Sequence, residues 1–482
     1  MRYLLDERYR LRGWKGASTG VFDTREKMAR FLYKEQYLLL LKCNGANDID
    51  PDELSEENRK AFDEFLEGKL IHQAGFAQYL KPEQEYKLYP ASYRQFAHWS
   101  ITGECNFNCR HCFMSAPQAK HGSPTHEQII SVADQLSECG VFQVGITGGE
   151  PLIRKDMLDI IDELCEREIG ISTIFTNGWL LDSDFLDELE KRSVHPSFQI
   201  SFDGVGCHDF LRGVPGAEKR TLDALKMLKE REYVVSVTMS LHRKNITTIR
   251  DTVNLMASLG VRSIKCGSMM DLGEWKNNGV GDLKLSPEEE LKAFEEYIPH
   301  YFEDNAPISI MLGGAFMYTP GESDWKIYNV VECPIEKERT VPSCGVITHN
   351  FYIGADGLVC PCMGMADCSY ASKFPNLYKT PLKEILADPA FINLCQVKIG
   401  DIRDHNSKCR ECKYVDRCSG GCRNSALMAG DDYYGIDEDQ CWFFENKGDE
   451  RIKAVAEGPF EEYLKRNPPI ETYNSHKKEV LE

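Results

Sequence analysis

The chain has 482 residues, of which 42% are hydrophobic and 28% charged. This length predicts two to four domains, and the composition is that of an ordinary folded protein. The net charge of −19, without any long basic run, argues against nucleic acid as a partner, because binding to phosphates needs clustered Lys and Arg. The sequence has no stretch of about 18 apolar residues and no secretory signal, so we expect a cytoplasmic protein without a membrane span.

The chain contains 19 cysteines, and they are unevenly placed. Three fall within 105–112, and seven fit a spacing pattern between 344 and 441. Disulfides require an oxidising compartment, which nothing in the sequence indicates. Clustered thiols in a cytoplasmic protein therefore predict bound metal.

Residues 1–95 predict a small separate unit of winged-helix-like architecture. We expect a short strand followed by three helices, the first of them capped by Asp23 and the second ended by Gly45. The expected strand covers 9–14, and the expected helices cover 22–32, 34–45 and 52–71. Two prolines within 81–90 predict a linker to the next domain.

Residues 96–310 alternate strand and helix patterns. The expected strands cover 96–102, 142–147, 171–176, 197–202, 234–241 and 262–269, with amphipathic helices between them. This alternation predicts an α/β fold with a parallel sheet and right-handed crossovers, which in six units is a partial (β/α)6 TIM barrel. Functional residues are then expected at the carboxyl ends of the strands.

The periodicity fades after residue 310, while glycine, proline and cysteine become frequent. Such a region cannot bury a large apolar core, so we expect bound metal to stabilise it. The expected divisions are a bridging region at 311–343, a cysteine-rich domain at 344–445 and a helical tail at 446–482.

The first cysteine group follows directly on the first barrel strand. Cys105, Cys109 and Cys112 are spaced Cys-x3-Cys-x2-Cys. Iron–sulfur clusters normally take four thiolates, so three would leave one iron open to a ligand. The alternatives are a zinc site, for which no fourth ligand lies nearby in the sequence, or three buried thiols.

Polar motifs follow the next strands. Gly148 and Gly149 would allow a ligand to approach the backbone closely, and Glu150 could accept a hydrogen bond from an ammonium group. The fourth strand brings Ser201, within reach of a ribose, and then Arg212, whose guanidinium could pair with a carboxylate. Each motif is weak alone, but their register with successive strand ends indicates one site.

With these motifs, residues 98–270 resemble the radical SAM superfamily, through the cysteine loop, GGEP, SFDG and HDFLRG. The resemblance implies a [4Fe–4S] cluster on Cys105, Cys109 and Cys112, whose open iron takes the amine and carboxylate of S-adenosylmethionine (SAM). It also places the 148–150 segment at the methionyl end of SAM, with Ser201 and Arg212 near its ribose and carboxylate. The family usually has an aromatic residue where this chain has His111.

The C-terminal cysteines resemble those of a SPASM domain, which carries two auxiliary iron–sulfur clusters. The resemblance assigns one cluster to Cys409, Cys412, Cys418 and Cys441, and the other to Cys344, Cys362 and Cys422. Asn350 stands where many relatives have a further cysteine, so either Cys333, Cys360 or Cys368 completes the latter cluster or its fourth iron is open. Three clusters are then expected in all. A double zinc module is the alternative for this region.

The N-terminal unit resembles the recognition element of enzymes that mature ribosomally made peptides. Such elements bind a leader peptide as an added strand. DNA binding is disfavoured because the third expected helix is acidic, with Glu56, Glu57, Asp63, Glu64 and Glu67. A purely structural cap is the alternative.

Together these features predict a radical SAM peptide maturase that forms a cross-link, with a cysteine thioether as the leading expectation. Its expected partners are a precursor peptide bound through its leader and a low-potential electron donor of the flavodoxin or ferredoxin type. The alternatives are carbon–carbon or carbon–oxygen cross-linking, epimerisation with Cys207 or Cys266 as hydrogen donor, maturation of an anaerobic sulfatase, and a non-catalytic electron carrier or zinc-bound adaptor.

Overall fold

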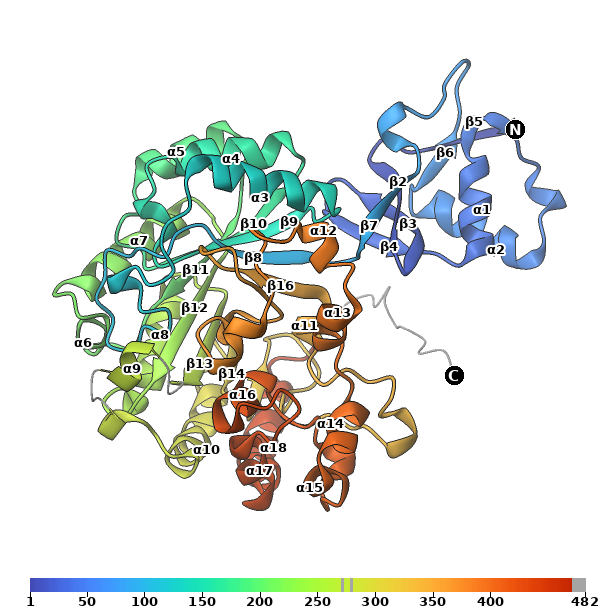
Figure 1. The fold of residues 1–482 in the computed structure, drawn as a ribbon. Helices are drawn as coiled ribbons and strands as arrows, with labels where there is room; N and C mark the ends of the chain where they lie inside the picture. Colours follow the sequence, from blue (N-terminus) through green and yellow to red (C-terminus); the bar gives the residue numbers. More distant parts are fainter. Residues whose placement is uncertain (270–272, 278–280, 470–482) are drawn as a thin grey trace.

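A computed structural model describes residues 1–269, 273–277 and 281–469. Its centre is a ten-stranded sheet, with a smaller N-terminal module on one side and a helical C-terminal region on another (Figure 1). No helix in the described part of the chain is long and apolar enough to cross a membrane. Residues 470–482 of the expected tail lie outside the described residues.

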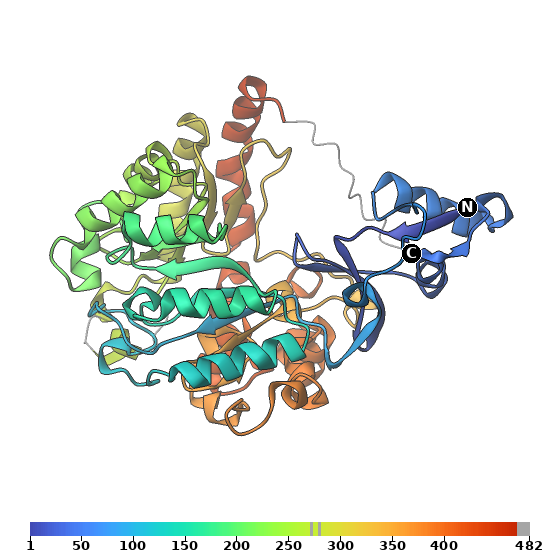
Figure 2. The same cartoon turned by 90° about the horizontal axis from the view of Figure 1, so that it is seen from above.

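The six predicted barrel strands are confirmed, and they are parallel neighbours in chain order. They are β8 (Phe96–Ser100), β9 (Gln143–Thr147), β10 (Gly170–Thr176), β11 (Ser197–Ser201), β12 (Val235–Leu241) and β13 (Ser263–Ser268). Between them run α3 (His126–Glu138), α4 (Met157–Glu166), α5 (Ser183–Lys191), α7 (Ala217–Glu230) and α8 (Ile249–Ser258), which lie along the sheet (Figure 2). Their apolar sides join one continuous core with the strands. The cysteine loop and the polar motifs therefore lie at one edge of the sheet.

The sheet extends beyond the predicted strands at both ends. β14 (Ser309–Leu312) adds in parallel beside β13, and β15 (Phe316–Tyr318) adds antiparallel to β14. On the other side, β16 (Asn350–Ile353) pairs in parallel with β8, and β17 (Val359–Cys360) follows it. The cysteine-rich region thus contributes strands to the barrel sheet, next to the strand that precedes the first cysteine loop.

The N-terminal module contains more strand and less helix than expected. Its short strands and two helices are β1 (Arg2–Leu5), β2 (Tyr9–Lys15), β3 (Ala17–Asp23), β4 (Met28–Phe31), α1 (Lys34–Lys42), β5 (Asn44–Asp48), α2 (Glu56–Glu67), β6 (Ile71–Gln73) and β7 (Lys87–Ser92). They form a three-stranded sheet in the order β5-β1-β6 and a four-stranded sheet in the order β4-β3-β2-β7. Tyr3 and Phe62 pack edge to face at 4.8 Å within the module's own core.

The predicted helix at 22–32 is wrong, because the segment is the β3–β4 hairpin. The Asp23 carboxylate accepts hydrogen bonds from the backbone N–H groups of Arg25 and Glu26, and Lys27 has a positive φ of 53°. Asp23 therefore caps a turn instead of a helix. The expected linker at 81–90 is also partly wrong, since β7 begins at Lys87 and pairs in parallel with β2.

The C-terminal helices pack on the last barrel helix. α18 (Gly448–Arg466) confirms the predicted charged helix and lies along α10 (Pro287–Glu303). Phe302 and Phe460 are 5.3 Å apart, and the Arg451 guanidinium bridges Glu288 and Glu295. These contacts fix α18 against α10.

Candidate cluster and SAM site

The three cysteines of the first group lie together in the loop after β8. Cys109 is buried, while Cys105 and Cys112 are partly buried against the same small apolar cluster. Phe107 and Trp179 belong to this cluster, with ring centroids 5.6 Å apart. The loop thus presents three thiols in a largely dehydrated pocket at the carboxyl edge of the sheet.

The environment of these thiols fits an iron–sulfur cluster. Burial raises the pKa of Cys105 to about 12 and also raises the pKa values of Cys109 and Cys112. A thiolate there needs a strong positive partner, which bound iron supplies. Backbone N–H groups of Phe107 and Ala116 donate to the sulfurs of Cys105 and Cys112 at 3.4 and 3.3 Å, contacts of the kind that tune iron–sulfur clusters.

The two glycines of the GGE motif pack directly against the cysteine loop. A Cβ on Gly148 would lie 2.6 Å from the carbonyl oxygen of Thr102, and one on Gly149 would lie 2.2 Å from that of Glu104. The Gly149 N–H donates to the Thr102 carbonyl at 2.9 Å. These glycines therefore position the loop, a role in addition to the ligand contact that the sequence predicts.

Glu150 is fully buried and joins the ends of two strands. Its carboxylate accepts hydrogen bonds from the Thr176 hydroxyl and the Asn177 N–H, both at 2.7 Å, and from the Leu152 N–H at 3.1 Å. Burial raises its pKa to about 7, although these donors oppose the shift. The predicted acceptor for a SAM ammonium thus also fixes the separation of β9 and β10.

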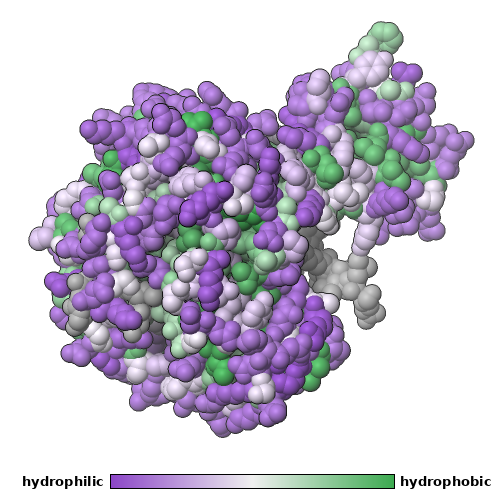
Figure 3. Space-filling model, viewed as in Figure 1, coloured by the Kyte–Doolittle hydropathy of each residue, from purple (hydrophilic) through white to green (hydrophobic). Residues whose placement is uncertain are grey.

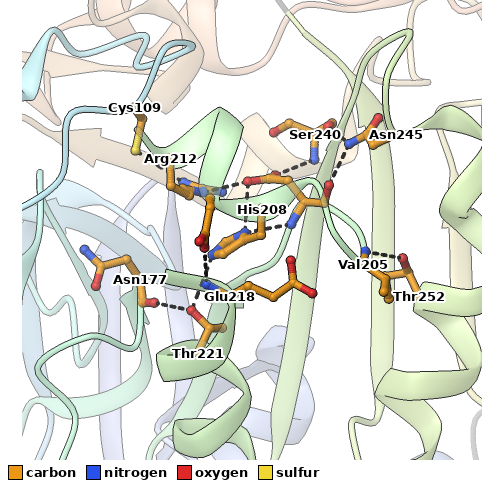
Figure 4. Close-up of polar contacts among 12 residues, drawn as sticks. Cys109, Asn177, Val205, His208, Arg212, Glu218, Thr221, Ser240, Asn245 and Thr252 are labelled. Atoms are coloured by element: carbon orange, nitrogen blue, oxygen red, sulfur yellow. Dashed lines mark hydrogen bonds and ion pairs between the residues drawn. The ribbon is translucent and has the colours of Figure 1, made fainter. Parts of the chain in front are cut away.

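Arg212 ends the short helix α6 (His208–Arg212) and contacts the cysteine loop (Figure 4). Its Nε donates to Asp203 Oδ2 at 2.6 Å, and its Nη1 lies 3.8 Å from the Cys109 sulfur. Asp203 Oδ1 accepts the Ser240 N–H at 3.0 Å. Burial opposes ionisation of Asp203, but Arg212 outweighs it and holds the pKa of that carboxyl well below its ordinary value.

The same buried network continues through His208 (Figure 4). The Asp203 N–H donates to His208 Nδ1 at 3.0 Å, so Nε2 carries the proton toward the Thr221 hydroxyl at 3.3 Å. Thr221 in turn donates to the Asn177 carbonyl at 3.2 Å, and the Asn245 amide donates to the Asp203 carbonyl at 2.8 Å. The contacts of Asp203, His208 and Asn245 were not predicted, although the SFDG and HDFLRG motifs contain the first two.

Ser201 and His111 complete the predicted site. Ser201 is the last residue of β11 and is partly exposed, next to the Asp203 turn. Burial lowers the pKa of His111 to about 3, so its imidazole is neutral. The structure thus brings the 148–150 segment, Ser201 and Arg212 to one edge of the sheet with the cysteine loop, as the sequence predicts.

Four C-terminal cysteines form one neighbourhood. Burial raises the pKa of Cys418, and the nearby thiols of Cys409 and Cys412 raise it further. Burial also raises the pKa of Cys441, and the nearby thiols of Cys409 and Cys418 add to that shift. N–H groups two residues further along the chain donate to the sulfurs of Cys412 and Cys418, at 3.5 and 3.4 Å. This is the donor arrangement seen in the first loop, and it fits the predicted ligand set.

The other three predicted ligands form a second neighbourhood. Burial raises the pKa of Cys362 to about 11, and the nearby thiols of Cys422 and Cys344 contribute to this rise. Cys360 lies near Cys362 of this set, since its thiol donates to the Cys362 carbonyl at 3.2 Å, and it also lies near Cys368 and Cys395; burial is the main cause of its raised pKa. The completion of this set, by a further cysteine or by an open iron, stays a prediction.

Arg423 lies beside both C-terminal cysteine sets, and this position was not predicted from the sequence. It follows Cys422 directly, is 1% exposed, and donates to the carbonyls of Tyr433 and Gly435 at 3.0 and 2.9 Å. Its electrostatic neighbours include Cys422 and Cys409. Burial raises the pKa of the Cys409 thiol, and the Arg423 guanidinium opposes that shift.

Within the ranges that the structure describes, no three His, Cys, Asp or Glu side chains converge on a single-ion site. A four-iron cluster binds each thiolate at a separate corner, so its ligands need not converge on one point. The relevant features are therefore thiols that lie near one another and N–H groups that donate to their sulfurs. In all three predicted groups the thiols lie near one another, and N–H donors to sulfur are present in the first loop and in the Cys409 set; these features fit iron–sulfur clusters.

A three-cysteine loop at the carboxyl edge of a parallel α/β sheet, with further cysteine groups beside it, defines the class of radical SAM iron–sulfur enzymes. Residues 99–256 match the Radical SAM superfamily, and residues 344–413 match the iron-sulfur cluster-binding domain SPASM. Residues 99–256 are therefore a radical SAM domain and residues 344–413 a SPASM domain, and the predicted resemblance is confirmed.

Similar proteins differ in activity. AlbA of Bacillus subtilis (strain 168), an antilisterial bacteriocin subtilosin biosynthesis protein, is 24% identical over 330 residues, which cover 68% of this chain and 66% of AlbA. An AdoMet-dependent heme synthase of Methanosarcina barkeri is 25% identical over 354 residues, covering 70% of this chain and 93% of the synthase. The crystal structure of Streptococcus suis SuiB bound to precursor peptide SuiA has a TM-score of 0.61 and 16% identity, and covers 91% of this chain and 99% of that one.

Proposed function

We propose that this enzyme matures a ribosomally synthesised precursor peptide by forming a cross-link, with a cysteine thioether as the favoured bond. The observation that carries the proposal is the joining of the N-terminal module to a radical SAM barrel and a SPASM domain. The SuiB match covers 91% of the chain, more than residues 96–482 make up alone, so it reaches into that module. SuiB was crystallised with a precursor peptide, and AlbA acts in bacteriocin biosynthesis.

In this proposal, Cys105, Cys109 and Cys112 would hold the cluster, which would supply reductive cleavage of SAM and thereby a 5′-deoxyadenosyl radical able to remove a hydrogen atom from the peptide. The protein's own residues position the reactants. Asp203 aims Arg212 at the cysteine loop, and Glu150 joins the ends of β9 and β10. The buried apolar residues around the loop exclude water from a reactive radical.

The N-terminal module has a surface suited to a peptide strand. Among the described residues, nine of the fifteen exposed large hydrophobic side chains lie in the first 95 positions, although these are only a fifth of the chain. Figure 3 shows hydrophobic residues over this module. β4 is an edge strand and carries Met28 and Phe31, which are 48% and 41% exposed. We infer that the leader adds along this edge.

Two auxiliary clusters on the SPASM cysteines would accept the electron that a cross-link releases, and a flavodoxin- or ferredoxin-type protein would supply electrons to the first cluster. This makes three clusters in the working enzyme. Their ligands would be the sets grouped above, with Cys409, Cys412, Cys418 and Cys441 in the complete set. The burial of these cysteines and their N–H donors support this assignment.

Epimerisation is less favoured than cross-linking. It would need a thiol that donates a hydrogen atom at the reaction site. Cys266 is fully buried beside Met239, with the two sulfurs 4.0 Å apart, and Cys207 donates to the Lys244 carbonyl at 3.4 Å. Neither contact presents a free thiol to a peptide.

The test uses the peptide encoded by the short reading frame that adjoins the gene. Purified enzyme, reconstituted anaerobically, is incubated with this peptide, SAM and reductant, and the peptide is analysed by mass spectrometry. A loss of two hydrogens supports cross-linking, and iodoacetamide resistance of one cysteine supports a thioether. Unchanged mass with deuterium uptake from D2O would replace the proposal with epimerisation. Full activity after deletion of residues 1–95 would instead favour the sulfatase-maturing alternative.

A further inference from the structure

A cavity of about 870 Å³ lies between the barrel and the SPASM domain. Ser268, the last residue of β13, and Gly313, just after β14, line it from the barrel side. Cys422, a predicted auxiliary-cluster ligand, lines it from the opposite side. The cavity therefore lies at the carboxyl ends of the barrel strands, where the SAM site also lies.

Packing contacts link the wall of this cavity to the cysteine loop of the SAM site. Met269, in its wall, packs in one buried cluster with Leu211 and Trp275. Leu211 directly precedes Arg212, whose guanidinium reaches Cys109. The Glu274 N–H donates to the Cys112 carbonyl at 2.9 Å. A peptide segment in the cavity would thus lie between the radical-forming site and the auxiliary thiols.

Glu290 is the carboxylate of α10 that faces this cavity. The Ser268 hydroxyl donates to its Oε2, and its Oε1 lies beside Gly313, where an added Cβ would come within 3.0 Å. No Lys, Arg or His in the described part of the chain forms an ion pair with Glu290, whereas Glu288, Glu289 and Glu295 of the same helix are all paired with arginines. Glu290 is thus a carboxylate directed at a cavity and without a counter-ion among the described residues.

We propose that Glu290 is the base that deprotonates the peptide group destined to form the new bond. This inference rests on the cross-linking function proposed above. In thioether formation the peptide S–H bond breaks, its proton moves to the Glu290 carboxylate, and the sulfur keeps the electron pair for the C–S bond. The partner carbon loses its hydrogen atom to the 5′-deoxyadenosyl radical, and the remaining electron leaves to an oxidised iron–sulfur cluster. The product is the peptide minus two hydrogens.

The charges around Glu290 suit a base that works near neutral pH. Burial raises its pKa to about 7; the Ser268 hydroxyl opposes this shift, and Asp439 of α17 (Glu438–Glu445) adds to it. The other charged side chains that line the cavity are Arg243, Asp282, Lys284, Asp437 and Glu438. Arg243 is bound by Glu289 at 2.8 Å and is not available to neutralise Glu290. The carboxylate form therefore grows as the pH rises through about 7.

The experiment compares Glu290→Gln with Glu296→Gln, an exposed position on the same helix. The substrate is the peptide encoded by the adjoining short reading frame, and the enzyme is the reconstituted full chain. For Glu290→Gln we expect 5′-deoxyadenosine release to persist within about threefold, while cross-linked peptide falls by about 10²-fold or more. Product formation by the wild type should rise through pH 7, and the variant should lose this rise. Glu296→Gln should behave as the wild type.

Glu290→Asp should recover part of the cross-linking, which a role in folding alone would not produce. Product formation by Glu290→Gln within twofold of the wild type, with the same pH profile, would overturn the proposal. Equal loss of 5′-deoxyadenosine and product, at unchanged iron content, would also overturn it, because the residue would then act before hydrogen abstraction. If the wild type itself produced no peptide lighter by two hydrogens, the cross-linking function would fail, independently of Glu290.

Discussion

Replacing Asp203 with Asn tests how the site holds Arg212. Both side chains are buried, at 0% and 10% exposure, and their closest contact is 2.6 Å. Removal of one partner of a buried ion pair leaves an uncompensated charge and costs about 3–5 kcal/mol. The amide oxygen of the variant could still accept the Ser240 N–H, so the expected loss arises chiefly from the stranded guanidinium.

Hydrogen–deuterium exchange measures this loss locally, without requiring reversible unfolding of the whole chain. A cost of about 3 kcal/mol corresponds to more than a hundredfold faster exchange at the amides it protects. We expect this acceleration in peptides that cover β12 and α6, and little change in β9. The matched control is Asp223→Asn, an exposed carboxylate paired with Lys219, which should change exchange by less than about threefold.

A double variant separates the stranded charge from lost packing. Asp203→Leu combined with Arg212→Met removes both charges, so its exchange should be slower than that of Asp203→Asn. If Asp203→Asn exchanged within threefold of the wild type, or if the double variant were the less protected of the two, the buried pair would not be what organises this site.

The remaining predictions concern the clusters, the leader and pH. The variant Cys409→Ser with Cys412→Ser should lose about four of roughly twelve irons per chain and still release 5′-deoxyadenosine; unchanged iron content would contradict its ligand assignment. Phe31→Asp should weaken binding of a fluorescent leader peptide at least tenfold in an anisotropy titration, while Ile335→Asp, also exposed but outside the module, should not. Glu150, whose pKa burial raises from 4.5 to about 7, binds more protons when folded than when unfolded between these values. Its contribution to stability is thus full below about pH 4.5 and lost as the pH rises through 7, and Glu150→Gln should flatten that slope in thermal melts.

The sequence pattern predicted those helices and strands that are buried by elements close to them in the chain. The six barrel strands are each apolar runs between amphipathic helices, so period and length identified them. The segment at 22–32 has helical spacing too, but Asp23 folds back onto two N–H groups and turns it into a hairpin. Composition could not distinguish these outcomes, because the partner strand β2 decides between them.

Long-range pairing was the part that the sequence could not show. The NFYI segment at 350–353 has the pattern of a strand, but only the fold shows that it pairs with β8 across more than 250 residues. The partners of Arg212 are of the same kind. A SAM carboxylate was the expected partner, whereas Asp203 holds the guanidinium. Among the cysteines, spacing predicted three groups, and their assignment as cluster ligands stays a prediction.

Anaerobic cleavage of SAM shows whether Cys105, Cys109 and Cys112 hold a SAM-cleaving cluster. Full-length enzyme, reconstituted with iron and sulfide and reduced with dithionite, is incubated with SAM, and 5′-deoxyadenosine is quantified by chromatography. We predict multiple turnovers by the wild type and none by a variant in which Cys105, Cys109 and Cys112 are all replaced by Ala. That variant should also contain about four fewer irons per chain. No 5′-deoxyadenosine from the iron-replete wild type, or equal amounts from the triple variant, would contradict this prediction.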